Sequence, residues 1–232
     1  MSAVKAKLRE LGYLLGISNS ARADKCIAKD ERENRGDFAF ADKVLAAQSA
    51  ASVKAPKQRY KLVDLERLLK QHLPLSILEI GSGGTTPVFA KYAKETGARV
   101  VSVDESEEWA GLTAQMVAAL GYADIVEFVI CPKRIDADKM EARYEGLPSE
   151  EFDFVLIDGP ALEQDGTSYK LAVCTDIFDL PPPKVIAVDM RRPTVDAIWH
   201  RLGNVYKTQL SDILGREARV GLSYFSVFVR RD

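Results

Sequence analysis

The sequence predicts an α/β protein built on a doubly wound, mostly parallel sheet of seven strands, with a helical extension before it. From Ser76 onward, short β-rich runs alternate with segments of helical apolar spacing, the pattern of βαβ crossovers with helices on both faces. The last two strand candidates follow one another without a full helical crossover, which predicts an antiparallel partner at one edge. Before residue 76 the apolar spacing is helical, so we expect residues 1–75 to form the extension.

The individual elements follow from local patterns. In the extension, helical spacing covers residues 7–16, 38–52 and 60–73, and Pro74 ends the last of these helices. The predicted strands are the runs 76–80, 98–104, 124–130, 152–158, 184–189, 204–210 and 223–230. Helices are predicted after the first five strands, at 87–97, 107–121, 136–146, 169–178 and 193–203. The third of these has the weakest pattern.

Composition argues against several classes of protein. With 47% hydrophobic and 28% charged residues, the chain can bury a core and is not expected to be disordered. A net charge of -2 argues against nucleic acid as the main partner, because phosphate binding usually needs a basic face. No apolar run approaches the ~18 residues that span a bilayer, and the basic N-terminus lacks the apolar stretch of a signal peptide. The widely spaced Cys26, Cys131 and Cys174 suit reduced thiols, so we expect a cytoplasmic protein.

The stretch ILEIGSGGTT, residues 77–86, combines a buried strand with a glycine-rich turn. Its glycines let the backbone turn tightly and let a ligand come close, because no Cβ is in the way. Thr86 is the expected N-cap of the next helix, with Pro87 at the first helical position. The turn should therefore lie at a helix N-terminus on the carboxyl edge of the sheet, where open α/β sheets bind ligands.

Two acids indicate which ligand this turn would hold. Asp104 ends the next strand about 20 residues beyond the glycines, where a carboxylate can accept hydrogen bonds from both hydroxyls of a ribose. A dinucleotide-binding turn would prefer a third glycine at the position of Thr86. Glu79, two residues before the first glycine, would repel a pyrophosphate but can pair with a positive amino group. These residues favour a nucleoside with a cationic, amino-acid-like tail.

Four stretches, LEIGSGGTT, VVSVDESEEW, FDFVLIDGP and VIAVD, occur in this order and at suitable spacing. In these stretches the chain resembles the class I S-adenosylmethionine-dependent methyltransferases, over residues 76–230. The resemblance implies S-adenosylmethionine as the cofactor and a sheet of strand order 3-2-1-4-5-7-6 with the seventh strand antiparallel. It divides the chain into a cofactor-binding domain at 76–232 and the extension at 1–75, which would act as a lid.

The resemblance also assigns roles to single residues. Trp109, just after the acid-ended strand, would either pack its own helix or contact the adenosine. The implied cofactor-binding residues are Glu79 near the methionyl ammonium, Gly81, Ser82 and Gly83 along the methionyl and ribose parts, Asp104 at the ribose diol, Glu105 beside the adenosine, Cys131 and Pro132 beside the adenine, and Asp158 and Gly159 near the transferred methyl group.

Asp158 and Asp189 are the candidate catalytic residues. Asp158 ends a strongly apolar strand at the ligand edge, where it can orient the acceptor or act as a general base, and Asp189 ends the adjacent strand. Metal-dependent catechol-type O-methyltransferases hold a divalent cation with acids at these two places, followed by an asparagine. Met190 stands where that asparagine would be, so a metal at Asp158 and Asp189 is the less favoured alternative. Arg191 and Arg192 would either clamp an anionic acceptor or lie on the surface.

We expect O-methylation of a small-molecule or sugar-like hydroxyl. The sequence IDGPALEQ lacks the D/N/S-PP-aromatic motif of enzymes that methylate exocyclic amines of bases. The loop 159–168, together with the extension, would cover the acceptor. The alternatives are a non-catalytic binding or assembly protein, an aminopropyl transferase and a dinucleotide-dependent oxidoreductase. The N-terminal helices are also candidates for a homo-oligomer contact.

Overall fold

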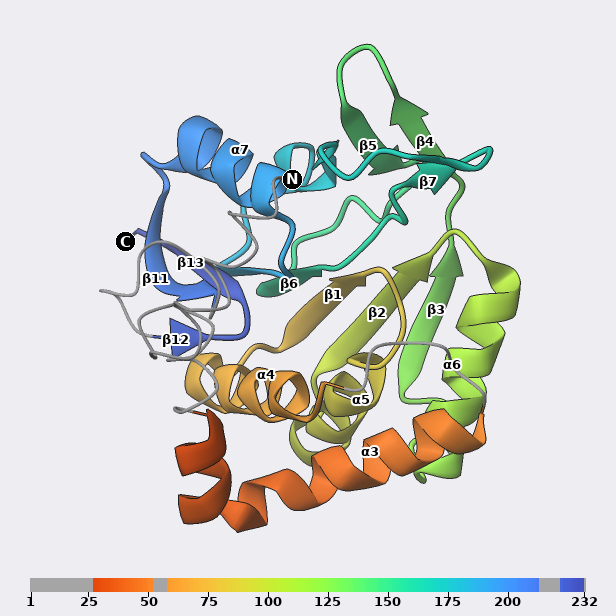
Figure 1. Ribbon diagram of the computed structural model, residues 1–232, viewed down its shortest axis with the longest axis vertical. Helices are drawn as coiled ribbons and strands as arrows, with labels where there is room; N and C mark the ends of the chain where they lie inside the picture. The colour runs from red at the N-terminus through yellow and green to blue at the C-terminus, as the bar shows by residue number, and fades with distance from the viewer. Residues whose placement is uncertain (1–26, 52–57, 213–221, 232) are drawn as a thin grey trace, which may run out of the picture.

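The computed structural model describes residues 27–51, 58–212 and 222–231, and a central sheet of eight strands runs through this part of the chain (Figure 1). The predicted helix at 7–16 and Cys26 lie outside the described residues. From one edge to the other, the strands are β3 (Val126–Ile130), β2 (Arg99–Asp104), β1 (Ser76–Ile80), β6 (Phe154–Ile157), β10 (Val185–Val188), β13 (Ser226–Arg230), β11 (Tyr206–Asp212) and β12 (Leu222–Ser223).

The strand order confirms the predicted fold class. The seven predicted strands all form, and in chain order they are arranged 3-2-1-4-5-7-6. The strand β13 runs antiparallel to both of its neighbours, β10 and β11, as expected for the seventh strand. The short β12, which pairs parallel with β11 at the edge, was not predicted. Two residues are too few to give a periodic signal in the sequence.

The sheet separates two apolar cores, because successive side chains of a strand point to opposite faces. On one face pack α3 (Phe38–Ala50), α4 (Arg59–His72), α5 (Thr86–Thr96) and α6 (Glu107–Ala119), with Ile77, Leu65 and Phe89 in the shared core. On the other face lies α7 (Arg192–Leu202), whose Ile198 belongs to the same core as Leu78. Figure 1 shows α3, α4 and α5 gathered on the side of the molecule opposite to α7.

The start of α5 differs from the prediction by one residue. Thr85, not Thr86, is the N-cap, and its side chain makes no capping hydrogen bond. The hydroxyls of both threonines instead donate to the Glu79 carboxylate, which explains why neither caps the helix. The helix ends where predicted, at Gly97, which has a φ of 76° that glycine adopts without strain.

Two predicted helices, at 136–146 and 169–178, are wrong. The first region is instead a hairpin of β4 (Lys133–Asp136) and β5 (Glu141–Tyr144), and β9 (Val173–Cys174) pairs with β5. Along β5 the side chains alternate, with Ala142 and Tyr144 buried and Arg143 exposed between them, and this period of two outweighs the helix-forming composition. The second region contains β9 and the short 3-10 helix η2 (Asp176–Phe178), so a small sheet lies where two crossover helices were expected.

In the part of the chain that the structure describes, no helix has the length and apolar character needed to cross a membrane.

Candidate active site

A cavity of about 490 Å³ opens at the carboxyl ends of β1, β2, β6 and β10. Its lining combines the glycine turn at 81–85 and the strand-end acids with residues of α3, α4 and α6. A volume of this size is typical of small-molecule and cofactor sites, which span roughly 300–1,000 Å³. The cavity therefore brings together, from distant parts of the chain, most of the residues that the sequence singled out.

The turn depends on a close approach between Gly81 and Gly159. Gly81 has a φ of 97°, and a Cβ at this position would lie 2.6 Å from the Gly159 nitrogen. A Cβ on Gly159 would meet the Tyr144 hydroxyl at 2.7 Å and the Gly81 backbone at 2.8 Å. Both positions thus require glycine, and the contact fixes the end of β1 against the end of β6.

Glu79 lies beneath the turn and is fully buried. Its carboxylate accepts hydrogen bonds from the hydroxyls of Thr85 at 2.5 Å, Thr86 at 2.7 Å and Ser102 at 2.6 Å. Burial raises the pKa of Glu79 to about 7, although the three hydroxyl donors favour the ionised form. Glu79 is not among the described residues that line the cavity, so in this conformation it supports the turn from below rather than reaching the ligand space.

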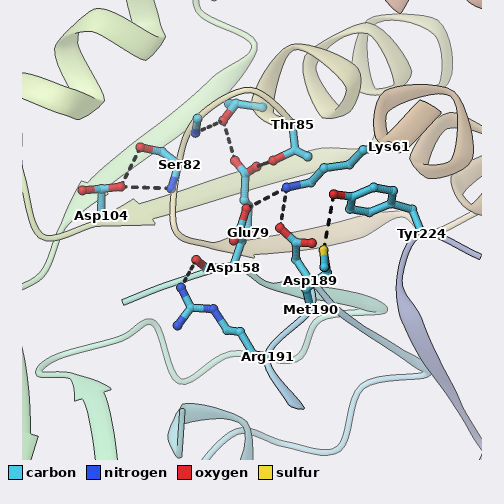
Figure 2. Close-up of polar contacts among 12 residues, drawn as sticks. Lys61, Glu79, Ser82, Thr85, Asp104, Asp158, Asp189, Met190, Arg191 and Tyr224 are labelled. Atoms are coloured by element: carbon cyan, nitrogen blue, oxygen red, sulfur yellow. Dashed lines mark hydrogen bonds and ion pairs between the residues drawn. The ribbon is translucent and has the colours of Figure 1, made fainter. Parts of the chain in front are cut away.

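Asp104 ends β2 at the cavity, as expected, and its carboxylate already has partners. Ser82 donates to its Oδ2 atom from the backbone nitrogen at 3.1 Å and from the hydroxyl at 3.0 Å (Figure 2). The Ser106 nitrogen donates to Oδ1 at 2.9 Å. Burial raises the pKa of Asp104, and the adjacent Glu105 acts in the same direction. The acid is therefore held in one orientation, with the turn and the start of α6 arranged around it.

Glu105 joins the cavity to the small sheet. It accepts hydrogen bonds from the Tyr144 hydroxyl at 2.6 Å and from the Lys133 ammonium at 3.1 Å. Burial opposes its ionisation, but these two partners together hold the pKa of Glu105 below its ordinary value. The backbone nitrogen of Ala161 also donates to Glu105, at 3.2 Å, so the start of the loop 159–168 is fastened here. The rest of that loop forms the hairpin of β7 (Glu163–Gln164) and β8 (Thr167–Ser168), which is exposed.

The structure does not bring Cys131 and Pro132 into the cavity. Cys131 is buried in the core on the α7 side of the sheet and its thiol donates to the Gly146 carbonyl, while Pro132 is exposed. Neither is among the described residues that line the cavity, in contrast to Trp109. The Trp109 indole nitrogen donates to the Ser82 carbonyl at 2.8 Å, which holds the ring beside the turn.

The residue that sequence reasoning missed is Lys61 of α4. Its ammonium lies 2.9 Å from Asp158 Oδ2 and 2.5 Å from Asp189 Oδ2, and so joins the ends of β6 and β10 (Figure 2). Lys61 lies on the same helical stripe as the buried Leu65 and Leu68, at spacings of four and seven residues. A lysine within an apolar stripe was the signal that could have identified it.

Lys61, Asp158 and Asp189 form a triad of one ammonium and two carboxyl groups, whose charges influence one another. Burial raises the pKa of Asp189, and the neighbouring Asp158 carboxylate adds to the effect, whereas Lys61 opposes it. Burial disfavours the charged form of Lys61, but the two carboxylates outweigh it and hold the pKa of Lys61 above its ordinary value. Lys61 is therefore an ammonium throughout the physiological range. The Oδ1 atom of Asp189 is buried and has no hydrogen-bond partner among the described residues.

Arg191 fixes the strand end rather than presenting a free guanidinium. It donates to the carbonyl oxygen of Asp158 (Figure 2). It also donates to the carbonyl oxygen of Pro160, at 2.9 Å. Met190 has a φ of 47° and its sulfur accepts a hydrogen bond from the Tyr224 hydroxyl. Arg192 lies in the first turn of α7, 3.4 Å from Asp196.

The donor set does not fit the divalent cation that the sequence left open. Asp158 and Asp189 do approach one another, but the Lys61 ammonium lies between them. Across the described ranges, no group of three or more histidine, cysteine or acidic residues is arranged to hold a metal ion.

No model of a known protein family matches the chain, and no curated protein sequence matches it. Solved structures do match. The SAH-bound methyltransferase PaMTH1 of Podospora anserina has a TM-score of 0.54 and 16% identity, over 82% of this chain and 88% of that one. A candidate caffeoyl-CoA O-methyltransferase of Staphylococcus aureus has a TM-score of 0.55 and 14% identity, over 90% and 99% of the two chains.

A candidate O-methyltransferase of Klebsiella pneumoniae is similar to the same degree, with a TM-score of 0.52 and 13% identity, over 84% of this chain and 90% of that one. At such low identity, the agreement concerns the path of the backbone. Together with the strand order and the antiparallel β13, it shows that the chain has the fold of the class I S-adenosylmethionine-dependent methyltransferases.

Proposed function

We propose that the chain is an S-adenosylmethionine-dependent methyltransferase that methylates a hydroxyl group of a small molecule. The observation that carries this proposal is that one cavity has the glycine turn and Asp104 at its lining together with Asp158. The first two suit a nucleoside with an amino-acid tail, and the third suits an acceptor. Solved structures with this fold support the proposal, one of which is described as SAH-bound and others as candidate O-methyltransferases.

On the donor side, each group around the turn has a role in binding the cofactor. S-adenosylmethionine, when bound, supplies an electrophilic methyl group on a sulfonium. Asp104 accepts hydrogen bonds from the ribose hydroxyls, for which Ser82 has to yield part of its contact with Oδ2. Trp109, already held by the Ser82 carbonyl, gives an apolar surface beside the nucleoside. Glu79 acts indirectly, by holding the turn through Thr85 and Thr86.

On the acceptor side, Asp158 is the group best placed to receive a proton. Its side chain is 33% exposed, more than that of Asp189 at 11%, and both residues line the cavity. Methylation of a hydroxyl requires the loss of one proton, and a carboxylate within reach of that hydroxyl can take it. Holding the acceptor in line with the methyl group and excluding water supplies the rest of the rate increase.

The helices before residue 76 would cover the acceptor. Leu45 and Gln48 of α3 and Leu62 of α4 line the cavity, so these helices contribute to the site although they precede the cofactor-binding region. In this proposal the exposed hairpin of β7 and β8 completes the cover when ligands are bound.

The test is transfer of a labelled methyl group from S-adenosylmethionine to a panel of phenols, catechols and sugar alcohols. We expect label on an oxygen of at least one compound, and a fall of about 100-fold or more in kcat for Asp158→Asn. Asp179→Asn is the matched control, because Asp179 pairs with Arg143 on the surface, away from the cavity. Label found on nitrogen, or full turnover by Asp158→Asn, would contradict the proposal.

A further inference from the structure

We propose that Lys61 is a catalytic residue, whose ammonium occupies the place of a divalent cation between the two strand-end carboxylates and binds the acceptor oxygen during transfer. This inference rests on the proposed function and deepens it. In this proposal the cation of the acceptor site is the Lys61 ammonium, which the chain itself supplies. Figure 2 shows Lys61 reaching from α4 between Asp158 and Asp189.

The geometry of the ammonium supports this role. Two of its three N–H donors are used, by Asp158 at 2.9 Å and by Asp189 at 2.5 Å. Its remaining donor has no hydrogen-bond partner in the described part of the chain, and Lys61 lines the cavity. The nitrogen also lies 5.9 Å from the ring centre of Tyr224 and 6.0 Å from that of Phe225, which favours a positive charge here. An acceptor oxygen at the third donor would complete its coordination.

A purely structural role for Lys61, that of holding α4 against the sheet, does not explain its position as well. The docking of α4 does not depend on Lys61, because Leu62, Leu65 and Leu69 anchor the helix in the core. The helix is further held by Asp64, whose Oδ2 accepts a hydrogen bond from the Tyr224 nitrogen at 2.6 Å. Burying the charges of Lys61 and its two partners costs desolvation free energy. Since the packing of α4 does not need this ion pair, its presence at the cavity indicates a functional use of the charge.

These groups account for every proton and electron pair that moves during methyl transfer. The acceptor O–H bond breaks and its proton goes to a carboxylate oxygen of Asp158. The oxygen lone pair forms the new O–CH₃ bond as the S–CH₃ bond breaks and the sulfur keeps that electron pair. Lys61 stays protonated and donates a hydrogen bond to the oxygen while negative charge develops on it. Asp189 holds the ammonium from the other side.

The first experiment needs neither donor nor acceptor, so it is independent of the proposed function. Binding of Mn²⁺ is measured by electron paramagnetic resonance at several pH values from about 7 to about 9, because burial raises the pKa of Asp189 above that of a free carboxylate. Lys61→Gln should bind Mn²⁺ at least about tenfold more tightly than the wild type, because Asp158 and Asp189 lose their counter-ion and become available as ligands. Equal Mn²⁺ affinities would overturn the proposal that the ammonium stands in the place of a cation.

The matched control is Lys91→Gln. Lys91 also bridges two carboxylates, those of Glu66 at 3.0 Å and Glu95 at 2.7 Å, but it lies on α5 outside the cavity. Glu66 keeps a second ammonium partner in Lys70, so this variant should bind Mn²⁺ no better than the wild type. A gain equal to that of Lys61→Gln would show a general effect of removing lysines, and would count against the assignment.

The second experiment uses any acceptor found in the methylation panel. Lys61→Gln should lower kcat by about 100-fold or more while SAH binds with an affinity within about threefold of the wild type. Lys61→Arg, which keeps the charge, should recover part of the rate. Wild-type turnover should be unaffected by a chelator, and this measurement does not depend on any variant folding. A wild-type rate that collapses with chelator, or an unchanged kcat in Lys61→Gln, would overturn the proposal.

Discussion

Replacing Glu79 by glutamine tests how the glycine turn is built. Glu79 is a fully buried carboxylate whose polar partners are the hydroxyls of Thr85, Thr86 and Ser102. Each hydroxyl can rotate to accept as well as donate, so glutamine can keep these hydrogen bonds. The substitution therefore removes the buried charge while it changes little else, and it imitates the protonated form of the wild type.

The size of the effect follows from the pKa of Glu79, which burial raises from 4.5 to about 7. In the unfolded chain this carboxyl loses its proton near its ordinary pKa, whereas in the folded protein it keeps the proton up to about 7. Between these values the unfolded state binds fewer protons, so the free energy of unfolding falls as pH rises. At about 1.4 kcal/mol per pH unit, the loss is about 3 kcal/mol and is complete above the folded pKa.

Urea denaturation of both proteins at about pH 5 and about pH 8 measures this contribution. The free energy of unfolding of Glu79→Gln should exceed that of the wild type by an amount that grows by about 2–3 kcal/mol between the two pH values. Glu163→Gln, on the exposed hairpin, is the control and should show no such growth. A stability difference that does not change with pH would refute the reasoning, because Glu79 would then have the same charge in both states.

Two further variants test the turn and the ribose site. Gly81→Ala should lower the melting temperature by about 4–8 °C, because the positive φ and the 2.6 Å approach of the new Cβ to the Gly159 nitrogen cost about 2 kcal/mol or more. The control Gly111→Ala, in the open face of α6, should be neutral or stabilising. Equal melting temperatures of the two variants in a thermal scan would contradict this reasoning. Asp104→Asn should weaken SAH binding about 10–100-fold in calorimetry with the fold retained, and an unchanged affinity would remove Asp104 from the site.

The fold could be predicted because its signals are local and repeated. The first five strands from Ser76 onward are rich in apolar residues and are followed by an acid or a turn, and the order of the strands then follows from βαβ connectivity and the resemblance. The two wrong helices show where this logic ends. At 136–146 the composition favours a helix, but the segment pairs with β4, which directly precedes it, and with the distant β9. The pairing with β9 leaves no local pattern in the sequence.

Some residues of the candidate site could likewise be predicted from the sequence, and others could not. Asp104, Asp158 and Asp189 could be placed from sequence, because each ends a parallel strand and such ends meet at one edge. Lys61 could not be placed in this way, since its ammonium reaches the strand ends from a helix 97 positions before Asp158. Cys131 was expected at the adenine because it follows β3. In the structure the chain turns directly into β4 and buries the thiol in the core on the α7 side of the sheet.

Calorimetric titration with SAH and, in parallel, with NAD⁺ tests the central claim most directly. The glycine turn and Asp104 at the cavity predict one SAH site per chain, with micromolar affinity or better, and no heat from NAD⁺. The predicted site should lose SAH affinity in Asp104→Asn and keep it in Lys61→Gln. An absence of SAH binding at millimolar concentration, or tighter binding of NAD⁺, would contradict the assignment of the cavity to a methyl donor.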